Sequence, residues 1–217
     1  MHMPKLQLAM DTYNLPSSLS VAQKTQNQID VMEVGTLLAV ENGMNAVRIM
    51  KSLFPNHIVL ADIRIIKAGG KLASLAFDSG ADWVTVVSDA SDETIEAVVT
   101  EANLRDNKDV QIEINEDFTI EQEDYWRSLG ISQIIYHRSN EVVEDEEKWS
   151  PEVIDQLKKL ADKGFKLSIT GGLTVDEIKL FKDIPVYCFI AGRKIVSSNN
   201  PDQTSKDYKE EINRVFG

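Results

Sequence analysis

Asp62, Arg64 and Lys67 are the residues whose types and spacing most directly suggest chemistry. They follow the apolar run at 58–61 within the segment 57–70, HIVLADIRIIKAGG. This pattern predicts a buried strand that carries a carboxylate and two cations at its carboxyl end. Because buried charge must be paired or must bind a metal, we interpret the segment as the floor of an active site. A structural ion-pair cluster at a strand end is the alternative.

Short apolar runs rich in valine and isoleucine alternate along the chain with segments of helical period. Eight runs predict strands at residues 5–11, 29–36, 58–64, 83–88, 110–114, 133–137, 166–170 and 186–193. Eight further segments predict helices at 18–28, 41–54, 70–79, 92–105, 119–129, 151–163, 175–181 and 201–216. This alternation is typical of parallel sheets covered by helices. We therefore expect one α/β domain over residues 1–217, a (β/α)8 TIM barrel, with a doubly wound sheet as the alternative.

In such a barrel the active site is built where the strands end. The residues at or beside the predicted strand ends are Asp11, Glu33, Thr36, Asp62, Arg64, Ser88, Glu113, His137, Thr170, Gly171, Gly172, Gly192 and Arg193. Glu33 and Asp62 fall on adjacent strands and offer two hard oxygen ligands. A metal ion bound by them would keep open coordination positions for water and substrate. The two residues predict a Mg²⁺ site, and the alternative for each carboxylate is a salt bridge.

The last two predicted strands end in the glycine-containing sequences TGGLT and AGR. Barrels of this type bind phosphate with the loops after strands seven and eight, and Arg193 would add a charge-assisted hydrogen bond. His137 ends the sixth strand at the same face, whereas His57 precedes the third strand and falls at the opposite face. His137 is therefore the candidate imidazole for proton transfer near neutral pH.

Composition limits the possible partners and the compartment. The chain of 217 residues has a formal net charge of −12, which argues against binding to nucleic acid or to an anionic membrane. Its one cysteine, Cys188, lies in the apolar run VYCFIAG and is expected to be a packed hydrophobic residue rather than a nucleophile. The single cysteine and the lack of a long apolar stretch predict a cytoplasmic protein.

At these positions the chain resembles the 3-keto-L-gulonate 6-phosphate decarboxylases of the orotidine 5′-monophosphate decarboxylase suprafamily, which also contains hexulose-6-phosphate synthase. The matching strings are LAMD, VMEVGT, IVLADI, ADWVTV, VQIEI, YHRS, TGGL and FIAGR. The resemblance implies a homodimer with active sites at the interface, Mg²⁺ on Glu33 and Asp62, and a phosphorylated keto-sugar acid as substrate. Loss of CO₂ would give an enediolate and then L-xylulose 5-phosphate, with Asp11 in the site and a proton delivered by His137.

The chain departs from the family at three positions. The family motif Asp-x-Lys-x-x-Asp reads Asp62-Ile-Arg64-Ile-Ile-Lys67 here, and Asn140 replaces an expected basic residue. Arg64 keeps a positive charge but does not deprotonate, and Lys67 reverses a charge that the family directs into the neighbouring subunit's site. Either Lys67 of the partner compensates for the lost lysine, or the chain is a weak enzyme or a sugar-phosphate-binding protein. Glu113 and Thr170 resemble the decarboxylase rather than the synthase, whose aldol chemistry is the second alternative.

Overall fold

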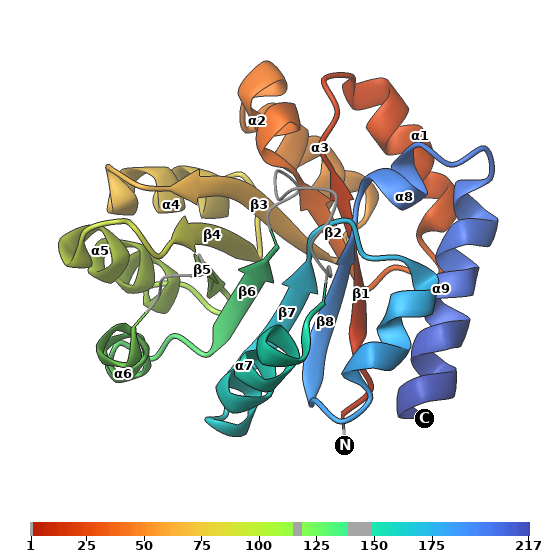
Figure 1. Cartoon of the computed structure of the whole chain (residues 1–217). Coiled ribbons are helices and arrows are strands. Elements are labelled where there is room, and N and C mark those ends of the chain that lie inside the picture. Colours follow the sequence, from red (N-terminus) through yellow and green to blue (C-terminus); the bar gives the residue numbers. More distant parts are fainter. Residues whose placement is uncertain (1, 115–118, 139–148) are drawn as a thin grey trace.

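The computed structural model describes residues 2–114, 119–138 and 149–217. Parallel strands form a closed barrel in sequence order, and β8 pairs with β1 to complete the ring (Figure 1). The strands are β1 (Lys5–Met10), β2 (Val31–Val34), β3 (Ile58–Ile65), β4 (Trp83–Val87), β5 (Asp109–Ile114), β6 (Gln133–His137), β7 (Lys166–Thr170) and β8 (Val186–Ala191). The structure thus confirms the (β/α)8 barrel rather than a doubly wound sheet.

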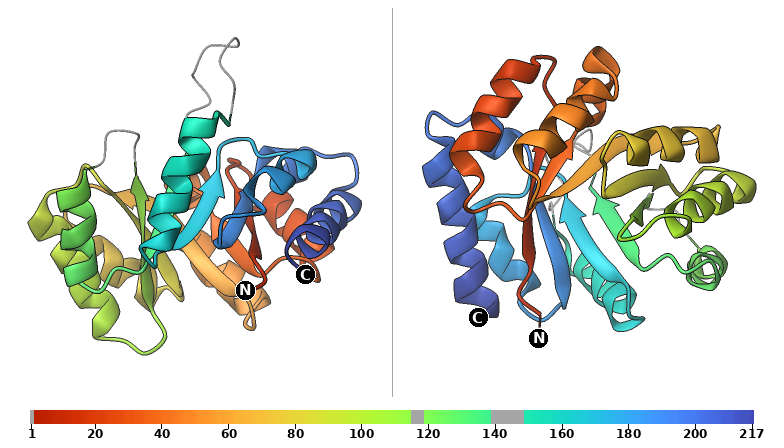
Figure 2. Two further views of the ribbon diagram at one scale, coloured as in Figure 1. Left: turned by 60° about the horizontal axis from the view of Figure 1, so that its bottom comes forward. Right: turned by 180° about the vertical axis from the view of Figure 1, so that it is seen from behind.

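Helices surround the barrel on its outer face, as the views in Figure 2 show. They are α1 (Leu15–Thr25), α2 (Thr36–Asn42), α3 (Asn45–Leu53), α4 (Gly69–Asp78), α5 (Asp92–Asn103), α6 (Ile120–Ser128), α7 (Pro151–Asp162), the 3₁₀ helix η1 (Val175–Phe181), α8 (Arg193–Val196) and α9 (Pro201–Phe216). In the described residues, no helix is long and apolar enough to cross a membrane.

Several predicted element boundaries were wrong, and three of these differences have a clear local reason. Instead of one helix over 41–54, the chain forms α2, which begins at Thr36, and the separate helix α3, because Gly43 adopts a positive φ of 61° and ends α2. Helix α1 begins at Leu15 instead of residue 18, since the Asn14 side chain caps it and a proline occupies its first turn. The eighth strand ends at Ala191, and Arg193 begins the short helix α8, which the sequence did not indicate.

The inside of the barrel carries a polar layer as well as apolar side chains. Gln7, Gln111, Gln133 and Ser168 have no exposed surface. Gln111 donates to Gln133 at 3.0 Å, and Gln133 donates to Asp109 at 2.6 Å. Cys188 is also fully buried, as expected, and burial raises the pKa of its thiol.

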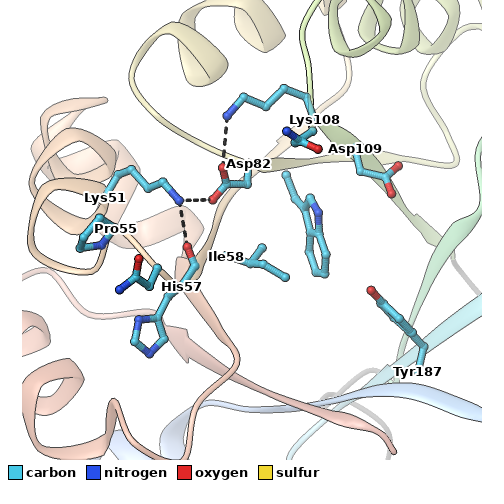
Figure 3. A pocket seen from close by; sticks show the side chains of 11 residues that line it. Lys51, Pro55, His57, Ile58, Asp82, Lys108, Asp109 and Tyr187 are labelled. Atoms are coloured by element: carbon cyan, nitrogen blue, oxygen red, sulfur yellow. Dashed lines mark hydrogen bonds and ion pairs between the residues drawn. The ribbon is translucent and has the colours of Figure 1, made fainter. Parts of the chain in front are cut away.

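A pocket of about 440 Å³ lies at the amino-terminal end of the barrel, opposite the predicted site (Figure 3). Asp82 joins the elements around it by pairing with Lys51 at 2.7 Å and with Lys108 at 3.2 Å. His57 lines this pocket, which confirms that it lies away from the carboxyl ends of the strands. The lysine pairs therefore tie together the connections that precede β3, β4 and β5.

Candidate active site

A cavity of about 860 Å³ opens at the carboxyl ends of the strands. Most of the residues proposed from sequence line it: Asp11, Glu33, Thr36, Asp62, Arg64, Glu113, His137, Thr170, Gly171, Gly172, Gly192 and Arg193. Lys67 is exposed and does not line this cavity, and Asn140 lies outside the described residues. The closed ring of strands explains the convergence, because it brings residues that are distant in sequence to one rim.

Glu33 is a buried carboxylate on the cavity floor. It lies near the end of the apolar strand β2 and is 5% exposed, and its Oε2 accepts a hydrogen bond from Gln7 Nε2 at 2.6 Å. Burial raises the pKa of Glu33 well above its usual value, and the neighbouring charge of Asp62 raises it further. A cation bound at this position would offset both effects, because an opposite charge favours the ionised carboxylate.

Asp62 projects from β3 and is held by two threonine hydroxyls. Thr85 Oγ1 donates to Oδ1 at 2.7 Å, and Thr36 Oγ1 donates to Oδ2 at 3.0 Å. Burial raises the pKa of Asp62, while the hydrogen bond from Thr85 and the charge of Arg64 oppose that rise. The carboxylate is thus oriented before any ligand binds.

This acidic pair fits a Mg²⁺ ion that keeps water ligands. The two carboxylates come from adjacent strands, both face the cavity, and mutual repulsion contributes to the raised pKa of Glu33. Within the described part of the chain, no group of three or more histidine, cysteine, aspartate or glutamate residues could hold a metal. Magnesium is compatible with so few protein ligands, because it accepts water and substrate oxygens in its remaining positions.

Arg64 lies close to Asp62 of the acidic pair and to Glu113. Its Nε is 3.6 Å from Asp62 Oδ2, and its Nη2 is 3.3 Å from Glu113 Oε1. Burial alone would lower the pKa of Arg64, but Glu113 and Asp62 outweigh that effect and the net shift is upward. The residue has a positive φ of 43° next to a break in the β3–β4 register, a strained conformation of the kind found at functional sites.

His137 ends β6 and uses one ring nitrogen for its contacts with charged groups. Its Nδ1 lies 3.0 Å from Glu113 Oε1 and 3.1 Å from Arg64 Nη2. Both contacts are partly buried, and the ring lines the cavity. The imidazole is therefore fixed at one edge and presents its remaining surface to the site.

Asp11 approaches the start of α2 at the mouth of the cavity. Its Oδ1 accepts a hydrogen bond from the Leu37 backbone N–H at 3.2 Å. Gly35 permits this approach, since a Cβ added there would clash with the same oxygen. The glycine in VMEVGT thus makes room for the carboxylate.

The glycine-containing loops form the other end of the cavity. Gly171 and Gly172 have φ values of 116° and 67°, and a Cβ at Gly171 would lie 2.7 Å from Arg138 Cβ. These positions favour glycine, because other residues rarely adopt this backbone, and Gly171 also has no space for a side chain. Arg193 and Lys194 line the same end, so two cations lie beside the glycine loops.

Sequence reasoning missed Gln7, Thr85 and Lys194. Gln7 orients Glu33, and Thr85 orients Asp62. Lys194 adds a second cation beside the glycine-containing loops. The strand period could have indicated Gln7 and Thr85. Side chains two residues apart share one face of a strand, so Gln7 lies on the face of Ala9, which lines the cavity. Thr85 pairs with Gln111 on the inward face of the barrel. Lys194 gave no signal, since it follows the predicted strand in an unrecognised helix.

The chain matches known proteins along its whole length. A family model described as Orotidine 5′-phosphate decarboxylase / HUMPS family matches residues 4–208. The chain is 39% identical over 217 residues to the 3-keto-L-gulonate-6-phosphate decarboxylase UlaD of Salmonella paratyphi B, covering 100% of both. It is 37% identical to a crystal structure of KGPDC from Streptococcus mutans, with a TM-score of 0.92 over 100% of both chains.

A crystal structure of 3-hexulose-6-phosphate synthase is 27% identical, with a TM-score of 0.85 over 96% of this chain and 99% of that one. The resemblance to this family was expected from short sequence matches near the strand ends. The comparisons extend it over the full length of the chain. The chain belongs to the orotidine 5′-phosphate decarboxylase / HUMPS family, a family of carboxy-lyases and related enzymes.

Proposed function

We propose that this protein catalyses the Mg²⁺-dependent decarboxylation of 3-keto-L-gulonate 6-phosphate to L-xylulose 5-phosphate through an enediolate, in the catabolism of ascorbate-type sugar acids in the cytoplasm. The main support is the set of groups that line one cavity, namely a buried acidic pair on β2 and β3, an imidazole on β6, and glycine loops with two cations after β7 and β8. A volume of about 860 Å³ suits a phosphorylated six-carbon acid.

Each group has a role that its position supports. Glu33 and Asp62 would hold Mg²⁺, which when bound supplies positive charge that stabilises the enediolate oxygens. Arg64 adds a fixed positive charge near Asp62 and Glu113, and Asp11, Thr36 and Glu113 contact the sugar hydroxyls. His137 returns a proton to the carbon that has lost CO₂. The phosphate binds to Thr170, Gly171, Gly172, Gly192 and Arg193, with Lys194 beside them.

The proposal includes a homodimer in which Lys67 reaches the partner's cavity. Lys67 is exposed and does not line its own cavity, although Arg64, three residues earlier, does. Large apolar side chains are exposed on the connections after β1, β2 and β3, namely Tyr13 (67%), Leu37 (41%), Val40 (79%) and Ile66 (52%). An interface would bury these side chains, and sedimentation measurements would show whether the protein is a dimer.

The decisive experiment is CO₂ release from 3-keto-L-gulonate 6-phosphate by the purified protein. We expect turnover with Mg²⁺ and its loss when EDTA is added, with recovery on return of Mg²⁺. The Asp62→Asn variant is a matched control, since it keeps the shape of the side chain and removes the charged ligand. Absence of turnover in the presence of Mg²⁺ would refute the proposal.

Two other functions have specific support. The 27% identity to a 3-hexulose-6-phosphate synthase makes aldol chemistry on ribulose 5-phosphate and formaldehyde the second candidate, and formaldehyde-dependent consumption of ribulose 5-phosphate tests it. The third is a sugar-phosphate-binding protein without turnover, supported by Arg64, whose guanidinium already lies 3.6 Å from Asp62. Tight binding of ribulose 5-phosphate in calorimetry, with no turnover of either substrate, would favour it.

A further inference from the structure

A side chain of the carboxyl-terminal helix holds the loop that follows β7. Tyr208 Oη in α9 donates a hydrogen bond at 2.5 Å to the backbone carbonyl oxygen of Leu173. Both residues are 1% exposed, so the bond is shielded from water. Burial raises the pKa of Tyr208 and the charge of Glu177 raises it further, so the hydroxyl keeps its proton and remains a donor. Because Leu173 lines the candidate active site, this bond acts directly on the cavity wall.

The same peptide group is held from its other side. The carbonyl that Tyr208 contacts belongs to the peptide bond between Leu173 and Thr174. The N–H of that bond donates to Glu177 Oε2 at 2.6 Å. Glu177 lies in the first turn of η1, and η1 packs against α9. Two side chains from different elements therefore fix both polar groups of one peptide.

Gly171 and Gly172 lie between this fixed peptide and the end of β7. Their φ values of 116° and 67° belong to a region that glycine enters easily, and glycine also leaves it easily because it has no side chain. On the strand side, the Thr170 carbonyl oxygen accepts a hydrogen bond from the Arg138 backbone N–H at 3.3 Å. The glycine pair is thus fixed at both ends. A loop that is held in its binding conformation loses less conformational entropy when a ligand binds.

We infer that Tyr208 is a positioning residue of the phosphate site: together with Glu177 it holds the Leu173–Thr174 peptide and keeps the neighbouring glycine pair in the conformation that receives a phosphate. This inference rests on the proposed function, in which these glycines bind the substrate phosphate. Tyr208 does not line the cavity, so it acts through the loop and not by contact with the substrate. Removal of its hydroxyl leaves the Leu173 carbonyl without its donor, and the glycines can then adopt other conformations.

The test is the binding of inorganic phosphate to the full-length protein, measured by calorimetry well below the unfolding temperature. Tyr208→Phe removes only the hydroxyl, and we expect it to weaken phosphate binding about three- to tenfold, the effect of one neutral hydrogen bond. Ser205→Ala is the matched control, because Ser205 is fully buried in the same helix and its hydroxyl donates within that helix to the Asp202 carbonyl. Both variants should lower the free energy of unfolding, but only Tyr208→Phe should lower the affinity for phosphate.

Amide hydrogen exchange of the phosphate-free protein gives a second measurement. We expect the amides of residues 171–174 to exchange faster in Tyr208→Phe than in the parent or in Ser205→Ala, while the amides of β7 exchange at the parent rate. Exchange that does not change in this loop would show that the hydroxyl does not hold it, and would overturn the inference.

The binding measurement is equally decisive. A parent protein that does not bind phosphate, or a Tyr208→Phe variant that binds it as tightly as the parent, would overturn the inference. If Tyr208→Phe does not fold, Glu177→Ala takes its place, because it releases the other side of the same peptide, and unchanged affinity in that variant would have the same meaning. Absence of CO₂ release by a protein that shows the expected loss of affinity would refute the proposed reaction and not this inference.

Discussion

Removal of the Thr85 hydroxyl tests whether the site is organised before ligand binding. Thr85 Oγ1 donates to Asp62 Oδ1 at 2.7 Å and accepts from the Arg64 backbone N–H at 2.9 Å. Thr85→Val keeps the shape of the side chain and removes both bonds. A hydrogen bond to a charged group contributes about 1.5–3 kcal/mol, and an N–H left without an acceptor costs about 1–3 kcal/mol. We therefore expect the free energy of unfolding to fall by about 3 kcal/mol near neutral pH.

Urea unfolding measures this loss, with Thr85→Ser as the matched control. Serine keeps the hydroxyl and lacks one methyl group, so it should cost only about 1 kcal/mol. Because the Thr85 bond lowers the pKa of Asp62, the valine variant should raise that pKa. The difference in free energy of unfolding between the parent and the valine variant should therefore become smaller as the pH falls and Asp62 takes up a proton. A valine variant as stable as the serine variant at neutral pH would show that the Thr85 hydroxyl does not hold Asp62.

Three further outcomes are expected. Because the raised folded-state pKa of Glu33 costs stability as the pH rises above about 4.3, Glu33→Gln should stabilise the metal-free protein at neutral pH and not at acid pH, which thermal unfolding at several pH values would show. Gly171→Ala, at φ 116° and with Arg138 2.7 Å from the added Cβ, should weaken binding of inorganic phosphate at least tenfold in calorimetry, and unchanged affinity would remove this loop from the phosphate site. The double variant Arg64→Lys/Lys67→Asp should exceed the parent in Mg²⁺-dependent kcat/KM, and strictly additive single effects would mean that the two positions do not share a site.

The barrel was predictable because each strand is a short apolar run with a polar residue at or beside its end. The predicted strands 133–137 and 166–170 match β6 and β7 at both ends, and the others differ by one or two residues at most ends. Helix boundaries were less predictable, since they depend on local backbone features. Gly43 splits one expected helix, and Asn14 begins another before its periodic residues appear.

The candidate site was predictable as a set of residues and not as a network. Position at strand ends indicated that Asp62, Glu113 and His137 would meet. Sequence could not show that Arg64 adopts a positive φ of 43° and contacts both Glu113 and His137, because that depends on a register break between β3 and β4. Whether Lys67 meets another subunit depends on an interface that one chain does not contain, so its role stays a prediction.

The pairing of β1 with β8 has a consequence for how the protein is made. Leu6 of β1 pairs in register with Phe189 of β8. Because β8 is the last strand of the chain, β1 leaves the ribosome long before this neighbour has been synthesised. At ordinary synthesis rates of about 5–20 residues per second, the edge of β1 waits roughly 10–40 s. Such an unpaired edge invites association with other chains, and slow non-local closure prolongs the risk. Since the acidic pair lies on early strands and the glycine loops follow the last two, a nascent chain has no complete cavity until the ring closes.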